Sequence, residues 1–143
     1  MRKRKTAIII GCGRLGSMLA GDLSSRGCGV TVIDKSPRAF DRLDDRFEGY
    51  TVTADGARAA VLKSCGITNA NIVVACTDSD SGNILAAEIA SELFSVENVY
   101  ARLDDDEKAS LLAPYNIESI CPHRLCLSRF LSLEGLLPGE AIA

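Results

Sequence analysis

Short apolar runs alternate along this chain with longer stretches in which apolar residues recur every three or four positions. Short apolar or β-branched runs are typical of buried parallel strands, and the longer spacing indicates helices with one apolar face. The pattern predicts strands at Ala7–Gly11, Gly29–Ile33, Tyr50–Thr53, Asn71–Cys76, Asn98–Arg102 and Ile117–Cys121. It predicts helices between and after them, at Arg14–Arg26, Pro37–Asp45, Ala57–Cys65, Ser81–Leu93, Glu107–Ala113 and His123–Leu133.

This regular alternation indicates an α/β fold, with a doubly wound parallel sheet that is Rossmann-like and forms a single domain. Ligands of such sheets bind outside the carboxyl ends of the strands, where the strand order reverses. We therefore expect the polar residues that end the predicted strands to share one edge of the sheet. These residues are Asp34, Asp55, Thr77, Asp78 and Arg102.

A glycine-rich turn follows the first predicted strand and opens the first predicted helix. In the usual roles of such a turn, Gly11 permits the sharp bend, Gly13 admits a pyrophosphate and Gly16 allows helix and strand to pack closely. Glycines that close a turn without a ligand are the alternative, but they do not explain why an acid, Asp34, ends the next strand. The turn contributes Gly11, Cys12, Gly13, Arg14, Leu15 and Gly16 to a candidate nucleotide site.

Asp34 discriminates between nucleotides, because a carboxylate there accepts hydrogen bonds from ribose hydroxyls and repels a 2′-phosphate. We expect an adenine nucleotide, either NAD(H) or ATP, ADP or AMP, and not NADP. The neighbouring Lys35 weakens that exclusion. An N-cap for the helix opened by Pro37 is the alternative role of Asp34.

The other candidates each have a structural alternative. Arg14 can reach phosphate oxygens or lie exposed on its helix, and Asp55 can contact the adenine or cap the following helix. Thr77 can face a second ribose or cap a helix, whereas Ser79 and Asp80 are expected to be caps.

Cys12 lies beside helix N-terminal N–H groups, which can lower the pKa of its thiol. The remaining cysteines show no CxxC spacing and are expected to pack as small hydrophobic residues. They are Cys28, Cys65, Cys76, Cys121 and Cys126.

Composition limits the remaining function classes. The chain has 143 residues, a hydrophobic fraction of 47% and a net charge of -3, which suit one packed domain and give no electrostatic case for nucleic acid. No signal peptide or membrane span is recognised, so we expect a soluble, cytoplasmic protein. The basic start, Arg2 to Lys5, is interpreted as a solvated tail.

Catalytic motifs are not recognised, so we expect a binding protein and not an enzyme. The sole histidine, His123, has no evident acid or nucleophile as a partner, and no tyrosine has a lysine four residues later. An NAD-dependent oxidoreductase or a redox-sensing NAD(H)-binding protein is the alternative.

The end of the chain predicts self-association, because its apolar residues exceed what one face of a small domain can cover. We expect a homodimer or larger oligomer through the last helix, with a domain over 1–135 and a tail or linker over 136–143. The apolar residues are Leu125, Leu127, Phe130, Leu131, Leu133, Leu136 and Leu137.

Nearly the whole chain resembles the RCK N-terminal domain, also called TrkA-N, of Trk/Ktr-type potassium-transport regulators. The resemblance rests on Ile10-Gly11-Cys12-Gly13-Arg14-Leu15-Gly16, Val32-Ile33-Asp34, Ala54-Asp55-Gly56, Val61-Leu62-Lys63-Ser64-Cys65-Gly66-Ile67, Ala75-Cys76-Thr77-Asp78, Tyr100-Ala101-Arg102 and Ile120-Cys121-Pro122. The family usually has Gly-Asp where this chain has Ala54-Asp55.

The resemblance implies a cytosolic regulatory subunit that binds adenine nucleotides and gates a membrane-embedded potassium transporter or channel. It also implies dimers packed through the last helix, often within octameric rings under a pore, with Arg14 near the partner subunit. The family's usual C-terminal ligand-binding domain is not recognised, which leaves open a stand-alone regulator or an excised domain.

Overall fold

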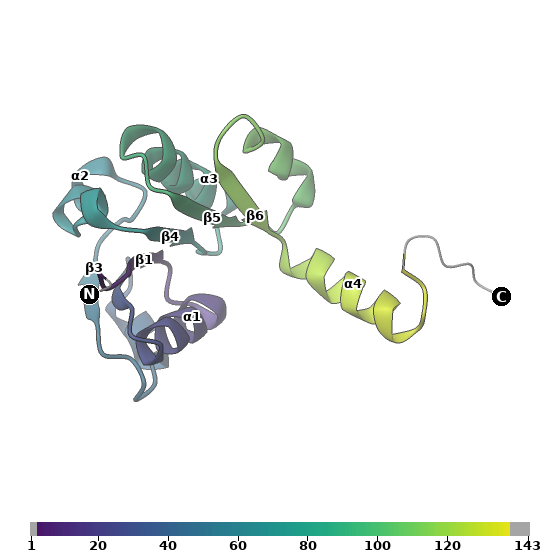
Figure 1. Ribbon diagram of the computed structural model, residues 1–143, viewed down its shortest axis with the longest axis horizontal. Coiled ribbons are helices and arrows are strands. Elements are labelled where there is room, and N and C mark those ends of the chain that lie inside the picture. The colour runs from purple at the N-terminus through teal and green to yellow at the C-terminus, as the bar shows by residue number, and fades with distance from the viewer. Residues whose placement is uncertain (1–2, 138–143) are drawn as a thin grey trace.

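A computed structural model describes residues 3–137 as one parallel sheet flanked by helices (Figure 1). The strand order is β3-β2-β1-β4-β5-β6, and every neighbouring pair is parallel. The order reverses between β1 and β4, which confirms the predicted doubly wound, Rossmann-like sheet. The strands are β1 (Thr6–Ile10), β2 (Gly29–Asp34), β3 (Tyr50–Thr53), β4 (Ile72–Ala75), β5 (Asn98–Arg102) and β6 (Ile117–Ile120).

Helices cover both faces of the sheet, with α1 on one face and α2 and α3 on the other (Figure 1). The α-helices are α1 (Arg14–Ser25), α2 (Ala59–Ser64), α3 (Asp80–Glu88) and α4 (Pro122–Leu133). Shorter helical segments are η1 (Pro37–Arg42), η2 (Ile67–Asn69), η3 (Ile89–Leu93) and η4 (Asp106–Leu111).

Three of the predicted helices are wholly or partly of a type other than α in the structure. The segments predicted at Pro37–Asp45 and Glu107–Ala113 are the 3₁₀ helices η1 and η4. Their i→i+3 bonds, such as Leu43 N–H to the Phe40 carbonyl at 3.1 Å, are those of a 3₁₀ helix. The end of the helix predicted at Ser81–Leu93 is the π-helical η3, where the Phe94 N–H reaches the Ile89 carbonyl at 3.3 Å.

The core consists of two layers, one on each face of the sheet. Alternate residues of β1 supply both, with Ile8 packing towards α2 and α3 and Ile9 packing towards α1. Because β1 is central, both residues are almost completely buried. The carboxyl end of β1, where the glycine turn begins, is therefore held from both sides.

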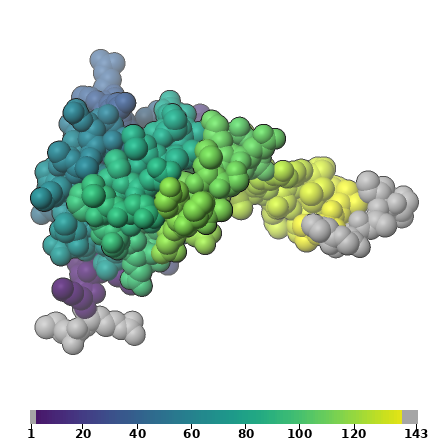
Figure 2. Space-filling view, turned by 90° about the horizontal axis from the view of Figure 1, so that it is seen from above, coloured from purple at the N-terminus to yellow at the C-terminus, as the bar shows by residue number. Residues whose placement is uncertain are grey.

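The last helix, α4, has no buried residue and extends away from the sheet in both views (Figures 1 and 2). Its apolar side chains are exposed, with Leu125 at 61%, Phe130 at 57% and Leu133 at 68%. Within residues 3–137, no helix is both long and apolar enough to cross a membrane. Of the predicted tail over 136–143, residues 138–143 lie outside the described part, as does Arg2 of the basic start.

The glycine turn leaves no room for a side chain at Gly16, because a Cβ there would lie 1.9 Å from the carbonyl oxygen of Gly11. We expect Gly16→Ala to lower the free energy of unfolding by about 2–4 kcal/mol, since backbone must move to relieve the clash. Urea denaturation followed by circular dichroism measures this change. Gly13→Ala is the matched control, because its added Cβ would have no atom within 4 Å. Equal stability of the two variants would contradict the proposed packing role of Gly16.

Candidate functional site

A cavity of about 1030 Å³ opens at the carboxyl ends of the strands. The residues predicted to share this edge of the sheet all line it, namely Asp34, Asp55, Thr77, Asp78 and Arg102. The expected gathering of polar strand-ending residues is therefore confirmed. The cavity lies at the ends of β1 and β4, between which the strand order reverses, and this is the usual ligand position for doubly wound sheets.

The predicted site residues divide into those that line the cavity and those that support it. The lining includes Gly11, Cys12, Gly13, Asp34, Lys35, Asp55 and Thr77. Arg14, Leu15 and Gly16 lie outside the lining, in the first turn of α1. Leu15 packs against the core layer around Ile9, Gly16 packs on the Gly11 backbone, and Arg14 is exposed.

The glycine turn brings main chain to the cavity without covering it. Gly11 has a φ of 103°, and a Cβ there would lie within 2.9 Å of the backbone of Cys76. Only glycine fits this close approach to the end of β4. At Gly13, which precedes α1, no side chain caps the helix. The first-turn N–H groups of α1 therefore remain available to an anionic group.

Asp34 joins the glycine turn to the segment after β2. One carboxylate oxygen, Oδ2, accepts the N–H of Cys12 at 2.8 Å, and Oδ1 accepts the N–H of Ser36 at 2.8 Å. The alternative role of Asp34 as a helix N-cap is wrong, because Ser36 occupies the cap position of η1. Each carboxylate oxygen can accept a further hydrogen bond, so the group can also receive ribose hydroxyls.

Asp55 stabilises the turn after β3. Its Oδ1 accepts the N–H of Ala57 at 3.0 Å, whereas α2 begins only at Ala59 with Arg58 as its N-cap residue. Asp55 is therefore not the helix cap that was one of its two predicted roles. Its carboxylate lines the cavity on the β3 side, beside Gly56.

Asn83 joins the ends of β4 and β5 through its buried side-chain amide. It was not among the predicted site residues. Its Oδ1 accepts the N–H and the hydroxyl of Thr77, at 2.9 and 2.6 Å. Its Nδ2 donates to the carbonyls of Thr77 and Arg102, at 3.0 and 2.9 Å. Because the side chain is only 1% exposed, these four bonds satisfy a polar group that water cannot reach. The available signal was the helical spacing of Asn83 from Ala86, Ala87 and Ala90, which are buried on the same side.

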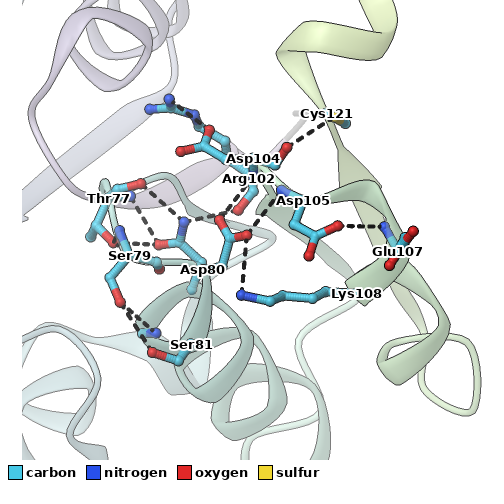
Figure 3. A network of polar contacts seen from close by, with 12 residues as sticks. Thr77, Ser79, Asp80, Ser81, Arg102, Asp104, Asp105, Glu107, Lys108 and Cys121 are labelled. Atoms are coloured by element: carbon cyan, nitrogen blue, oxygen red, sulfur yellow. Dashed lines mark hydrogen bonds and ion pairs between the residues drawn. The ribbon is translucent and has the colours of Figure 1, made fainter.

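Of the two residues predicted to cap the helix after β4, Ser79 does so and Asp80 does not. Ser79 caps α3, since its Oγ accepts the Gly82 N–H at 3.1 Å, as predicted. Asp80 is not a cap: its carboxylate accepts the N–H groups of Asp104 and Asp105, at 2.8 and 3.0 Å, and pairs with Lys108 (Figure 3). Burial opposes ionisation, but these donors lower the pKa of Asp80. Asp80 thus fixes the turn after β5.

Basic residues from two segments also line the cavity. Arg38 and Arg42 come from η1, on the same side as Asp34, and Arg102 comes from the end of β5. Arg102 Nη2 donates to Asp104 Oδ1 at 3.0 Å, while its buried Nε has no hydrogen-bond partner in the described structure. Arg38 and Arg42 were not predicted as site residues, because the sequence did not show which side of the helix predicted at Pro37–Asp45 would face the cavity.

Both cysteines of the cavity are protonated at neutral pH. Burial, together with the charge of Asp34, raises the pKa of the Cys12 thiol, so the expected lowering by the helix N-terminus is wrong. Burial raises the pKa of Cys76 to about 12. Thiolate chemistry in this cavity is therefore disfavoured. Within residues 3–137, no group of His, Cys, Asp or Glu is arranged to hold a metal ion.

The strand order, the glycine turn and the acid at the end of β2 define a Rossmann-type domain. The profile of the TrkA-N domain family matches residues 7–121, so the chain belongs to this family. It is 39% identical, over 134 residues, to a Trk system potassium uptake protein TrkA from Streptomyces coelicolor. That match covers 94% of this chain and 59% of the relative, so the chain spans little more than half of that protein.

Solved structures share the fold at lower sequence identity. The TrkA-N domain of the inner membrane protein ybaL from Escherichia coli superposes with a TM-score of 0.78 at 18% identity, covering 93% of this chain and 98% of that one. The GsuK structure bound to ADP superposes with a TM-score of 0.72 at 19% identity, covering 92% of this chain and 34% of that one. The GsuK channel bound to NAD has the same score and identity, with coverages of 90% and 23%.

The raised pKa of Cys76 predicts a pH dependence of stability. Its pKa in the folded state is above the unfolded value near 9, so its contribution is complete below pH 9 and is lost as the pH rises towards 12. We expect the free energy of unfolding to fall by up to about 1.4 kcal/mol per pH unit in this range from this group. Urea denaturation at pH 8 to 11 measures the slope. Cys76→Ala is the control, and an equally steep slope in that variant would contradict the assignment.

Proposed function

We propose that this chain is an adenine-nucleotide-binding regulatory domain that controls potassium ion transport through a ligand-dependent contact and not through catalysis. The observation that carries this proposal is the position of the Asp34 carboxylate. It lies in the cavity, bonded to the N–H of Cys12, beside an α1 N-terminus that no side chain caps. A ribose acceptor next to a phosphate-binding helix terminus is the arrangement that an adenosine phosphate requires.

The proposed binding residues have distinct roles. The backbone of Gly11, Cys12 and Gly13 and the first turn of α1, at Arg14, Leu15 and Gly16, receive the phosphates. Asp34 accepts the ribose hydroxyls, with Lys35 beside it, and Asp55 faces the adenine. Thr77 contacts the ligand beyond its first phosphate, at the end of β4. The solved GsuK structures bound to ADP and to NAD support an adenine nucleotide as the ligand.

The control of potassium transport is supported by family membership and by the similarity to the Trk system potassium uptake protein TrkA of Streptomyces coelicolor. The proposed partner is a membrane-embedded potassium transporter or channel subunit, which the domain contacts from the cytoplasmic side. The binding domain comprises residues 1–135, and residues 136–143 begin a tail or linker.

A regulatory role, as opposed to catalysis, is supported by the chemistry of the cavity. Its two thiols have raised pKa values, and His123 lies in the first turn of α4, outside the lining. No residue pair in the lining therefore provides a nucleophile with an adjacent histidine base. A spectroscopic assay for NADH consumption tests this part of the proposal, and turnover above the buffer rate would contradict it.

Self-association through α4 is proposed from its exposed apolar face. Helical spacing places Leu127, Phe130 and Leu133 on one side of α4, where each is at least 44% exposed. A helix that contacts so little of its own domain is stabilised when a second copy covers that side. A homodimer or a larger assembly built from it is therefore the proposed form.

Removal of the Asp34 carboxylate tests the nucleotide site. We expect Asp34→Ala to weaken AMP and ADP binding by about 1.5–3 kcal/mol, the usual value of hydrogen bonds to a charged group. Isothermal titration calorimetry measures the affinity, and thermal unfolding checks that the variant remains folded. Asp45→Ala, at an exposed acid outside the cavity lining, is the charge-matched control. Unchanged affinity in a folded Asp34→Ala protein would rule out the ribose contact.

A charge on the apolar side of α4 tests self-association. We expect Phe130→Asp to shift the protein from dimer or larger species to monomer at micromolar concentration, because burial of a carboxylate in an apolar interface is costly. Light scattering measures the mass with and without nucleotide. Ser128→Asp adds the same charge on the opposite side of α4 and should leave the assembly intact. A wild-type protein that is monomeric under both conditions would refute the proposed interface.

A further inference from the structure

The guanidinium of Arg102 has an incomplete set of partners within the cavity lining. Its Nη2 donates to Asp104 Oδ1 at 3.0 Å, but its buried Nε has no hydrogen-bond partner among residues 3–137. Nε and Nη2 form one edge of the guanidinium, the edge that binds a carboxylate or phosphate through two parallel hydrogen bonds. Asp104 therefore occupies only half of this edge, and the second N–H carries an unmet desolvation cost.

Arg102 lies at the end of the cavity opposite to the proposed adenosine position. Asp34 ends β2 and Arg102 ends β5, and β1 and β4 lie between them in the sheet. Three strand spacings of about 4.8 Å separate the two ends by roughly 14 Å. With the ribose at Asp34 and the first phosphate on the glycine turn, a group further along the ligand lies over the ends of β4 and β5. Arg102 is the cation that lines this part of the cavity.

We propose that Arg102 is a specificity-determining residue that binds the terminal phosphate of an adenosine di- or triphosphate. This inference rests on the proposed nucleotide function and chooses among the ligands that Asp34 leaves open. A terminal phosphate satisfies Nε and Nη2 together, which one oxygen of Asp104 does not. The positively charged nicotinamide of NAD⁺ in the same place is repelled by the guanidinium, and AMP is too short to reach it.

Replacement of Asp104 by a phosphate requires little rearrangement. The Arg102 and Asp104 side chains are 28% and 46% exposed, so solvent weakens their ion pair. The backbone on both sides is held independently. Asn83 binds the Arg102 carbonyl, and Asp80 binds the Asp104 N–H (Figure 3). Asp104 can therefore rotate into solvent while Arg102 keeps its place at the end of β5.

The other charges near Arg102 are compatible with this role. Asp78 lines the cavity after β4 and is exposed to solvent, where its charge is screened. The Cys76 thiol, which the Arg102 charge also influences, stays neutral because its pKa is raised to about 12. Asp104 is thus the anion that competes directly with a ligand phosphate for the guanidinium.

Calorimetric titration of AMP, ADP, ATP and NAD⁺ into wild type and Arg102→Gln tests the inference. We expect wild type to bind ATP more tightly than AMP, and Arg102→Gln to lose about tenfold or more in ATP affinity. AMP affinity should change by less than about twofold, since AMP does not touch Arg102, and NAD⁺ should bind no more weakly than before. Arg102→Lys should retain part of the ATP preference, because a lysine supplies the charge without the two-bond edge.

Two further variants serve as controls. Asp104→Asn removes the competing anion and should tighten ATP binding while leaving AMP binding unchanged. Arg58→Gln removes an exposed cation outside the cavity lining and should leave the order of ligand affinities as in wild type.

The outcomes separate this inference from the function on which it rests. If wild type binds none of the four nucleotides, the proposed function fails. If it binds them but Arg102→Gln weakens AMP and ATP equally, or weakens neither, the nucleotide site stands and the role of Arg102 is overturned. Retained AMP binding in Arg102→Gln also shows that the variant is folded, so a selective loss of ATP supports the inference directly.

Discussion

The close backbone contact between the glycine turn and the end of β4 is the constraint on which the cavity depends. A side chain at Gly11 would meet the backbone of Cys76, and one at Gly16 would meet the Gly11 carbonyl. These contacts hold the start of α1 against the sheet, with Gly13, the residue before the helix, in the cavity lining. Gly11 and Gly13 bring main chain without side chains to the cavity, which leaves room for a phosphate to approach.

Polar side chains connect the strand ends around this contact. Asp34 joins the glycine turn to the segment after β2, and Asn83 joins the ends of β4 and β5. Asp80 extends the same arrangement to the turn after β5. In each case a side-chain oxygen accepts backbone N–H groups that no strand or helix satisfies, which is the usual requirement for a partly buried turn. The lining is therefore organised before any ligand arrives.

The cavity and α4 present different chemical groups to a binding partner. The cavity presents main-chain donors and charged groups, such as Arg102 with its unpaired Nε, that a polar ligand satisfies. The helix presents apolar side chains that an apolar surface satisfies. The turn after β5 lies between them in the chain, with Asp104 paired to Arg102 and Asp106 paired to Arg124 of α4. In the proposed binding mode, a phosphate that displaces Asp104 from Arg102 therefore acts two residues before Asp106, the partner of Arg124.

The sequence by itself determined the strand pattern, the parallel sheet and the edge at which the polar residues gather. These features follow from local rules: apolar runs, glycines at a sharp turn and acids at strand ends. It also determined that Ser79 caps a helix. Only the tertiary structure decided the partner of each polar group. Asp34, Asp55 and Asp80 all accept backbone N–H groups that lie outside the first turn of the helix that each was proposed to cap. It likewise decided the helical type of η1, the pKa of Cys12 and the half-paired state of Arg102. These properties depend on burial and on residues distant in the chain, and a pattern of neighbouring residues carries no information about either.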